Sequence, residues 1–183
     1  MMVEPGRAAQ VAADIARHPV VGFDTESKPV FVRGQVQDGP HLVQLAVADR
    51  AWLFSMLDPQ SVQAVAALMQ RPELWKVGFG LTADHAQLTR RLGAAPASMI
   101  DLDSVYRQQG YRHSTGIRMA MAITFGRYFE KSKTIGKSDW SRRPLSAPQC
   151  RYAAHDAWGA YRIYAELVAQ GVEISPGLLG MQG

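Results

Sequence analysis

The sequence predicts an α/β fold in which helices pack on a mixed β-sheet. Strand-like segments follow one another in the first half of the chain, and strands alternate with helices in the second half. Adjacent strands favour an antiparallel meander, whereas alternating strands and helices favour parallel βαβ units. The 183 residues, with 47% hydrophobic and 20% charged side chains, are typical of one compact domain. We expect that domain to cover residues 1–183, with its core at about 20–170 and peripheral termini.

The first half of the chain contains the expected meander. Apolar residues at helical spacing predict a helix over 11–17, which ends at the His18-Pro19 pair. β-branched, aromatic and alternating apolar residues then predict strands, and Asp49-Arg50 forms the turn of a hairpin between the second and the third. The expected strands are 20–23, 41–48 and 51–54.

The second half alternates between strands and helices. Asp58 followed by Pro59 marks a helix start, because aspartate caps the helix N-terminus and proline suits the first turn. The sequence Ser146-Ala147-Pro148 opens the last and longest helix. The expected helices are 59–69, 82–92, 102–109, 117–125 and 148–170, and the expected strands are 75–79 and 97–100.

Cysteine content and hydropathy exclude several classes of protein. Cys150 is the sole cysteine, so the chain has no internal disulfide and no cysteine cluster for a zinc site. The N-terminus lacks the apolar core of a signal peptide, and no segment approaches the roughly 20 apolar residues of a membrane span. We therefore expect a reducing, cytoplasmic environment and no membrane association.

Two carboxylates stand at alternate positions where the first strand ends. Side chains two residues apart on an extended chain point the same way, so Asp24 and Glu26 can converge on one point. Hard oxygen ligands of this kind select Mg²⁺ or Mn²⁺ rather than zinc. A pair of solvated carboxylates in a loop is the alternative interpretation.

Three further residues have the spacing or position of site residues. Tyr152 and Asp156 are four residues apart on the last helix, so they lie on one face, although Tyr152 also suits a core position. Asp84 lies near the start of the helix at 82–92, where a carboxylate also complements the helix dipole. The order of these motifs, a DxE after a strand, an Asp after a strand-to-helix turn and a YxxxD on the last helix, favours one shared site.

The segments around these residues are VVGFDTESKP, KVGFGLTADHAQL and SDWSRRPLSAPQCRYAAHDAWGAYRIY. They closely resemble the three exonuclease motifs of the DEDD superfamily, in the tyrosine-containing (DEDDy) branch that includes ribonuclease D and the Werner-type exonuclease domain. The resemblance runs from about Val20 to Leu167. Arg151 stands where the sister branch has a histidine, which favours the tyrosine branch. Ser27 and Asp139 depart from common residues of the family, but neither departure removes a metal ligand.

The resemblance implies a ribonuclease H-like sheet and a metal-dependent 3′-5′ exonuclease that releases 5′-mononucleotides. Two divalent ions, Mg²⁺ or Mn²⁺, would clamp the scissile phosphate. By similarity, Asp24 would contact both ions, and Glu26 and Asp156 would hold the ion that carries the attacking water. Asp84 would support the second ion and Tyr152 would orient the water. The implied partner is single-stranded or 3′-ended nucleic acid, either DNA or RNA, and nothing in the sequence names a protein partner.

A basic segment at 127–143 directly precedes the helix that carries Tyr152. It has six cations and two anions, which accounts for the whole formal net charge of +4. A solvated loop is one interpretation, and guidance of the nucleic acid strand is the favoured one. The cations expected to bind nucleic acid are Lys131, Lys133, Lys137, Arg142 and Arg143. The segment 31–39, with Arg33, is a second candidate, for stacking on terminal bases.

Two alternatives come from other classes of protein. Residues 78–83 match GxGxxA between a strand and a helix and precede Asp101 by about 20 residues, as in dinucleotide-binding oxidoreductases. A turn that places Asp84 needs glycines as well. The other alternative is a catalytically inactive nucleic-acid-binding module of the same fold. Loss of one carboxylate would be its signature, and all four carboxylates are present.

Overall fold

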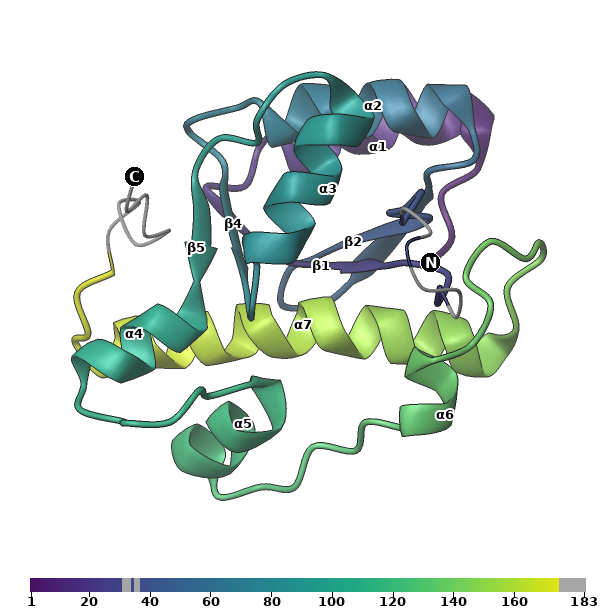
Figure 1. The fold of residues 1–183 in the computed structure, drawn as a ribbon. Coiled ribbons are helices and arrows are strands. Elements are labelled where there is room, and N and C mark those ends of the chain that lie inside the picture. Colours follow the sequence, from purple (N-terminus) through teal and green to yellow (C-terminus); the bar gives the residue numbers. More distant parts are fainter. Residues whose placement is uncertain (31–33, 35–36, 175–183) are drawn as a thin grey trace.

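The computed structural model describes residues 1–30, 34 and 37–174 (Figure 1). At its centre lies a five-stranded mixed sheet in the order β3-β2-β1-β4-β5. The first three strands pair antiparallel, and β4 and β5 continue the sheet in parallel with β1. The strands are β1 (Val20–Glu26), β2 (Leu42–Ala46), β3 (Ala51–Ser55), β4 (Trp75–Gly78) and β5 (Met99–Asp101). The predicted meander followed by βαβ units is confirmed.

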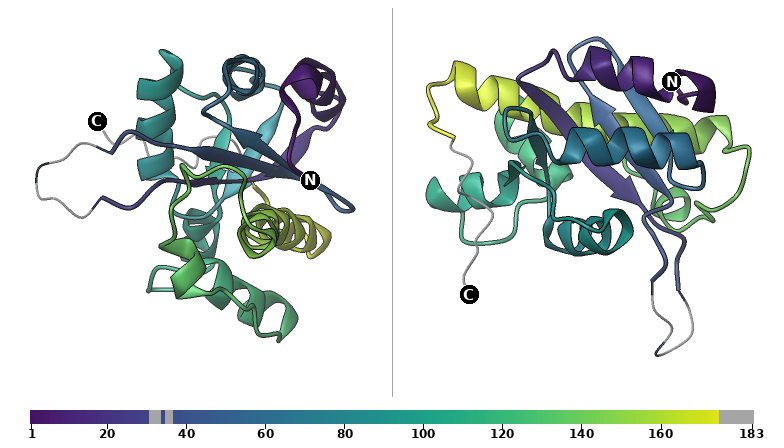
Figure 2. Two further views of the ribbon diagram at one scale, coloured as in Figure 1. Left: turned by 90° about the vertical axis from the view of Figure 1, so that its right-hand side faces the viewer. Right: turned by 90° about the horizontal axis from the view of Figure 1, so that it is seen from above.

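Helices cover both faces of the sheet, as Figures 1 and 2 show. Helices α1 and α2 pack against each other on one face, and α7 crosses the opposite face along β1 and β2. Helix α5 packs on α7. The helices are η1 (Pro5–Arg7), α1 (Ala8–Ile15), α2 (Pro59–Met69), α3 (Thr82–Leu92), α4 (Leu102–Gln108), α5 (Ile117–Phe125), α6 (Lys133–Gly136) and α7 (Ala147–Ala169). Helices α2, α3, α4, α5 and α7 begin and end within one residue of their predicted positions.

Strand β1 continues beyond its predicted end at Phe23. Its register pairs Asp24 with Gln44 and Glu26 with Leu42, so both carboxylates belong to the strand rather than to a following loop. The neighbouring β2 supplies the hydrogen bonds that keep this part of the chain extended, and the sequence of β1 alone does not reveal them. The ladder therefore fixes the direction of both side chains.

Gly22 allows α7 to approach β1 closely. A Cβ atom at this position would lie 1.9 Å from the carbonyl oxygen of Ala157 and 2.9 Å from the Cβ of Tyr161. Any side chain would therefore push the helix away from the strand. Because alternate residues of a strand share a face, Gly22 lies on the same face as Asp24 and Glu26. The close contact thus places both carboxylates beside α7.

The N-terminal residues differ from the expectation of a peripheral terminus. The N–H of Val3 donates to the carbonyl of Leu53, whose own N–H donates to the carbonyl of Met1. Val3 is buried, and one face of α1 is buried in the core with it. Because β3 is an edge strand, the pairing covers backbone groups that would otherwise be open. Val3 and the buried face of α1 therefore belong to the core, although they precede Val20.

A short helix, α6, lies in the basic segment, where none was predicted. The hydroxyl of Ser132 accepts a hydrogen bond from the N–H of Ile135, and the helix ends at Gly136. Four residues are too few to show a helical repeat in a sequence. Helix α7 begins as predicted, with reciprocal hydrogen bonds between Ser146 and Gln149.

Part of the expected base-stacking segment at 31–39, including Arg33, lies outside the described residues, as do residues 175–183. Within the ranges that the structure describes, every helix is too short or too polar to cross a lipid bilayer.

Candidate active site

Three carboxylates converge where the end of β1 meets α7. Asp24 and Glu26 project from β1, and Asp156 projects from α7. One oxygen of each carboxylate lies within 4.8 Å of the other two. Asp156 is buried, and the two strand residues are partly buried. Oxygen ligands at this spacing, held by a strand and a helix, suit a divalent cation such as Mg²⁺ or Mn²⁺.

Asp84 joins this cluster through Thr25. It lies in the first turn of α3, and its Oδ1 accepts a hydrogen bond from the hydroxyl of Thr25, between the two strand carboxylates. Asp84 is not one of the three carboxylates that lie within a shared metal-binding distance. The structure therefore places the fourth predicted ligand beside the cluster, where the hydroxyl of Thr25 holds it.

Burial raises the pKa of all four carboxyl groups. For Glu26, burial and then the charge of Asp24 raise the pKa to about 9. Burial and the charge of Asp156 raise the pKa of Asp24 well above its ordinary value, and burial raises the pKa of Asp84 and Asp156 too. Negative charges this close repel one another, so full ionisation of the cluster needs added positive charge. A divalent ion supplies such charge, and the donor set therefore fits a metal site.

Lys131 places a positive charge inside the cluster. Its Nζ lies 2.8 Å from Oδ2 of Asp156, and its side chain is 31% exposed. Burial alone would lower the pKa of Lys131, but the carboxylates of Asp156 and Asp24 raise it above its ordinary value. The ammonium group therefore neutralises part of the charge of the cluster. The sequence grouped Lys131 with the cations of a surface segment and gave no sign of this inward position.

Tyr152 lies one helical turn before Asp156 on α7. The ring centroid is 5.3 Å from Nζ of Lys131 and 6.0 Å from that of Trp140. Burial and the charge of Asp156 raise the pKa of Tyr152 to about 12. The phenol is therefore protonated at neutral pH, where it can orient a water but is a poor base. Gly136 leaves room for the hydroxyl, since a Cβ there would lie 2.6 Å from it.

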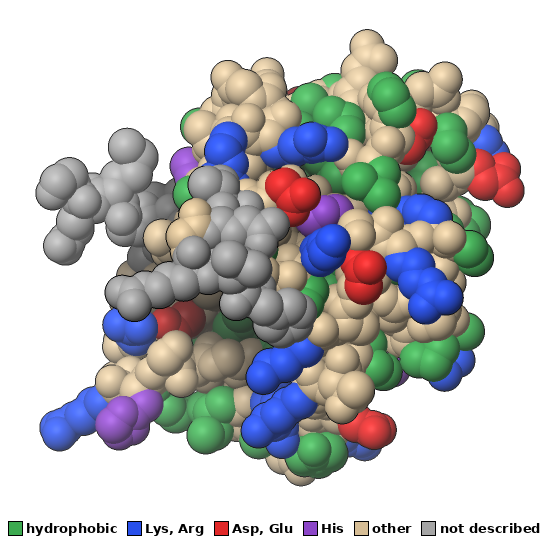
Figure 3. Space-filling model, turned by 45° about the vertical axis from the view of Figure 1, so that its right-hand side comes forward, with side chains coloured by type: hydrophobic (Ala, Val, Ile, Leu, Met, Phe, Trp, Pro, Cys, Tyr) green, Lys and Arg blue, Asp and Glu red, His purple; other side chains and the backbone are tan. Residues whose placement is uncertain are grey.

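The other cations of the basic segment have different surroundings. All five are exposed to solvent: Arg127, Lys133, Lys137, Arg142 and Arg143. Arg143 also donates to the hydroxyl of Ser55 at 2.7 Å and to the carbonyl of His41 at 3.1 Å, which ties the segment to β3. Figure 3 shows Lys and Arg side chains spread over this side of the molecule rather than gathered in one patch.

A cavity of about 430 Å³ opens beside the cluster and extends to the start of α5. Asp24, Lys131 and Asp156 line it together with Phe79 and the first residues of α5. This volume lies in the range of about 300–1,000 Å³ that is common for small-molecule sites. Tyr152 lines a separate cavity of about 470 Å³. The carboxylates therefore have room beside them for a substrate group.

The glycine-rich turn before α3 has a structural explanation. The N–H groups of Gly80 and Leu81 each donate to the carboxylate of Asp101 at 3.0 Å. In a dinucleotide site, such N–H groups would face phosphate and the acidic residue would bind ribose. Here Asp101 occupies the N–H groups itself, and Gly80 adopts a φ of +67° that favours glycine. The turn places α3, and with it Asp84.

Sequence reasoning missed three contacts at the site, made by Thr25, Gly136 and Trp140. Thr25 was visible as the central residue of DxE, but its hydrogen bond to Asp84 spans 59 residues of sequence. Gly136 and Trp140 surround Tyr152, and the tryptophan of the SDW segment was the one available signal.

Comparisons with known proteins show the family to which the chain is similar. A family model described as 3′-5′ exonuclease matches residues 4–171. The human exonuclease mut-7 homolog is 29% identical over 181 residues, covering 82% of this chain and 20% of the relative. Ribonuclease D of Granulibacter bethesdensis (strain ATCC BAA-1260 / CGDNIH1) is 30% identical over 162 residues, covering 87% of this chain and 39% of the relative. The chain thus spans less than half the length of these curated relatives.

A solved structure has the same fold. The structure of Trypanosoma brucei RNase D in complex with RNA U12 matches with a TM-score of 0.81 and 18% sequence identity. The match covers 96% of this chain and 64% of that chain. It confirms the predicted ribonuclease H-like arrangement of the sheet and its helices.

Proposed function

Because the chain belongs to the family of 3′-5′ exonuclease domains, we propose that it is an active 3′-5′ exonuclease that depends on divalent metal ions. It hydrolyses phosphodiester bonds of DNA or RNA from the 3′ end and releases 5′-mononucleotides. The observation that carries this proposal is the cluster of Asp24, Glu26 and Asp156, whose oxygens lie within 4.8 Å of one another. Asp84, bonded to Thr25, and Tyr152, on the same helix as Asp156, lie beside that cluster.

The carboxylates are the residues that hold the ions. Asp24, Glu26 and Asp156 would hold Mg²⁺ or Mn²⁺ ions, and Asp84 would support them from beside the cluster. A pair of such ions supplies an activated water and positive charge for the leaving 3′ oxygen. The raised pKa values of the carboxyl groups support this role, because the cluster accepts its full negative charge only when cations are present.

Tyr152 and Lys131 position the reacting groups. The phenol of Tyr152 remains protonated at neutral pH, since its pKa is raised to about 12, and it orients the attacking water by hydrogen bonding. Lys131 lines the same cavity as Asp24 and Asp156, where its ammonium attracts the negatively charged phosphate. Tyr152 therefore orients the water and Lys131 attracts the phosphate, and neither residue removes a proton.

The substrate is single-stranded or 3′-ended nucleic acid. The cavity of about 430 Å³ beside the carboxylates has room for a terminal nucleotide. The exposed Lys133, Lys137 and Arg142 attract the strand from outside. The RNA complex of the Trypanosoma brucei protein, which has the same fold, supports nucleic acid as the partner. We further propose that the chain acts as one domain in a reducing, cytoplasmic environment.

Digestion of labelled strands tests the proposal. Single-stranded DNA and RNA, labelled at the 3′ or the 5′ end, are incubated with Mg²⁺, Mn²⁺ or EDTA. We expect metal-dependent release of the 3′-terminal mononucleotide and a loss of at least about 100-fold in rate for Asp24→Asn, because a metal ligand is removed. Asp49→Asn, on the exposed hairpin turn, is the matched control and keeps wild-type activity. Metal-independent binding without any cleavage would instead identify an inactive nucleic-acid-binding module.

A further inference from the structure

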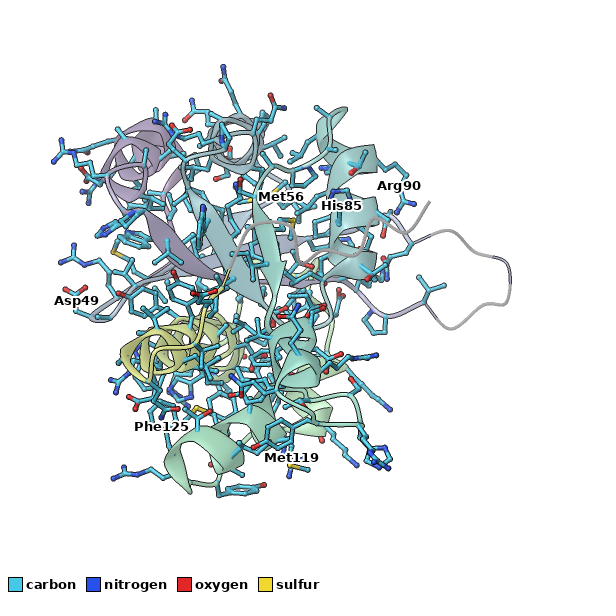
Figure 4. All side chains as sticks on the ribbon, turned by 90° about the vertical axis from the view of Figure 1, so that its left-hand side faces the viewer. Asp49, Met56, His85, Arg90, Met119 and Phe125 are labelled. Carbon is cyan, nitrogen blue, oxygen red and sulfur yellow. The ribbon has the colours of Figure 1, made fainter. Side chains whose placement is uncertain are left out.

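An exposed aromatic and basic surface lies on α5 and the turn that follows it. This α5 patch consists of Arg118, Met119, Arg127 and Tyr128. Tyr128 is 76% exposed and Met119 is 57% exposed. Figure 4 shows the labelled Met119 on the outer side of α5, away from the sheet. The patch therefore presents contact surface to solvent rather than to the core.

Local contacts hold the tyrosine ring in place. Gly126 ends α5 with a φ of +63° and turns the chain back toward the helix. The guanidinium of Arg118 then donates to the hydroxyl of Tyr128 at 3.2 Å and lies 5.4 Å from its ring centroid. An exposed ring fixed by a cation loses little conformational freedom when a flat group stacks on it. The patch is thus prepared for a planar ligand.

The α5 patch is continuous with the candidate active site. Arg118 and Met119 line the cavity that contains Asp24 and Asp156. The same two residues line a second hollow, of about 570 Å³, together with Arg127 and Tyr128. A polymeric ligand that extends from the carboxylate cluster past the start of α5 would therefore reach the α5 patch directly.

The chemistry of the patch fits single-stranded nucleic acid. The described residues that line the outer hollow include two arginines and no carboxylate, which suits phosphate groups. Exposed aromatic rings beside arginine stack on bases, and bases are available for stacking only where they are not paired. A peptide partner would be expected to meet a larger apolar surface than Met119 and Tyr128 provide.

We propose that the α5 patch binds the nucleotides that precede the 3′-terminal one, so that Tyr128 stacks on an unpaired base while Arg118 and Arg127 contact phosphates. This inference rests on the proposed exonuclease function, since it requires the 3′ end to lie at the carboxylate cluster. It makes the enzyme selective for strands with a single-stranded 3′ segment of several nucleotides.

Binding and turnover of long and short substrates test the inference. Fluorescence anisotropy in EDTA measures the Kd of a labelled single strand, and kinetics in Mn²⁺ compare the KM of that strand with the KM of a dinucleotide. Tyr128→Ala raises the Kd of the strand by about tenfold, the usual size of a lost base–aromatic contact, and raises its KM more than that of the dinucleotide. Tyr128→Phe, which keeps the ring, stays near wild type.

A charge variant and its control complete the experiment. Arg118→Gln lowers the slope of log Kd against log salt concentration by about one, the value for one phosphate contact. Arg17 is an exposed arginine just beyond α1, and Arg17→Gln leaves this slope unchanged. An unaltered Kd for Tyr128→Ala together with an unaltered salt dependence for Arg118→Gln would overturn the inference. Absence of cleavage by the wild type in Mn²⁺ would instead count against the proposed function, because the anisotropy measurement does not depend on catalysis.

Discussion

At the scale of single residues, Lys131 lies beside the carboxylates of the cluster, and each charge shifts the pKa of the other. The Nζ atom of Lys131 lies 2.8 Å from Oδ2 of Asp156, which is one of the three carboxylates that could hold a metal ion. A metal ion bound there must therefore displace the ammonium or share the carboxylates with it. Lys131 is thus a counter-ion for the acidic cluster, and we expect it to stabilise the folded protein when no metal is bound.

Removal of the Lys131 ammonium is expected to lower the stability of the metal-free protein and to increase the stabilisation that a bound metal ion gives. Lys131→Met leaves the charge of Asp156 uncompensated, so the metal-free protein is destabilised, by about 1–3 kcal/mol for a pair that keeps some solvent contact. Mn²⁺ no longer has to displace an ammonium group, so the ion stabilises the variant more than the wild type. Thermal unfolding in EDTA and in Mn²⁺ measures both effects, and 1 kcal/mol corresponds to about 2–4 °C at this size.

Lys133→Met is the matched control, because Lys133 is exposed in the same segment. It is expected to unfold like the wild type under both conditions. If Mn²⁺ stabilises Lys131→Met no more than the wild type, the ammonium does not compete with the metal.

At the scale of elements, the contact between β1 and α7 decides the geometry of the site. Asp24 and Glu26 come from one element and Asp156 from the other, so their separation depends on how closely strand and helix approach. Gly22 sets that approach, since an added Cβ would lie 1.9 Å from the backbone of α7.

Gly22→Ala is therefore expected to destabilise the protein by about 3 kcal/mol, the upper part of the range for overpacking, because the contact is with rigid backbone. The displacement of α7 would separate Asp156 from Asp24, so the proposed nuclease activity is expected to fall as well. Chemical denaturation measures the change in the free energy of unfolding. Gly6→Ala, where an added Cβ meets nothing within 4 Å, should stay within about 0.5 kcal/mol of the wild type. Equal stability of the two variants would show that α7 accommodates the methyl group.

The elements could be predicted from the sequence wherever a local signal was strong. Helix α3 runs from Thr82 to Leu92 as predicted, because its apolar spacing and following glycine are local features. The end of β1 could not be predicted, since the ladder with β2 extends it to Glu26. Helix α6 is too short to show a period. The inward position of Lys131 depends on the tertiary fold, so it cannot be predicted from the spacing of charged residues along the sequence.

At the scale of the whole molecule, the charge of the cluster makes stability depend on pH. The ordinary pKa of a glutamate is 4.5, and that of Glu26 is raised to about 9 in the folded protein. Between these values the folded state binds a proton that the unfolded state has released, so stability is lost as pH rises through this window. The pKa values of Asp24, Asp84 and Asp156 are raised as well and act in the same direction.

Urea denaturation in EDTA at a series of pH values from about 5 to 9 measures this dependence. The free energy of unfolding is expected to decrease more steeply with pH for the wild type than for Glu26→Gln, which has no carboxyl group to titrate. With Mn²⁺ present, the stabilisation by the ion increases with pH, because metal binding requires deprotonated carboxylates. A Glu26→Gln protein with the same pH dependence as the wild type would contradict the raised pKa.

We propose above all that the carboxylate cluster holds the metal ions of an active exonuclease. The rate at which the 3′-terminal nucleotide is released, measured against Mn²⁺ concentration for the wild type and for Asp156→Asn, tests it most directly. The predicted result is saturable activation of the wild type, no release in EDTA, and a rate at least about 100-fold lower for Asp156→Asn at every Mn²⁺ concentration. Release that is independent of Mn²⁺, or equal in the two proteins, would contradict the claim.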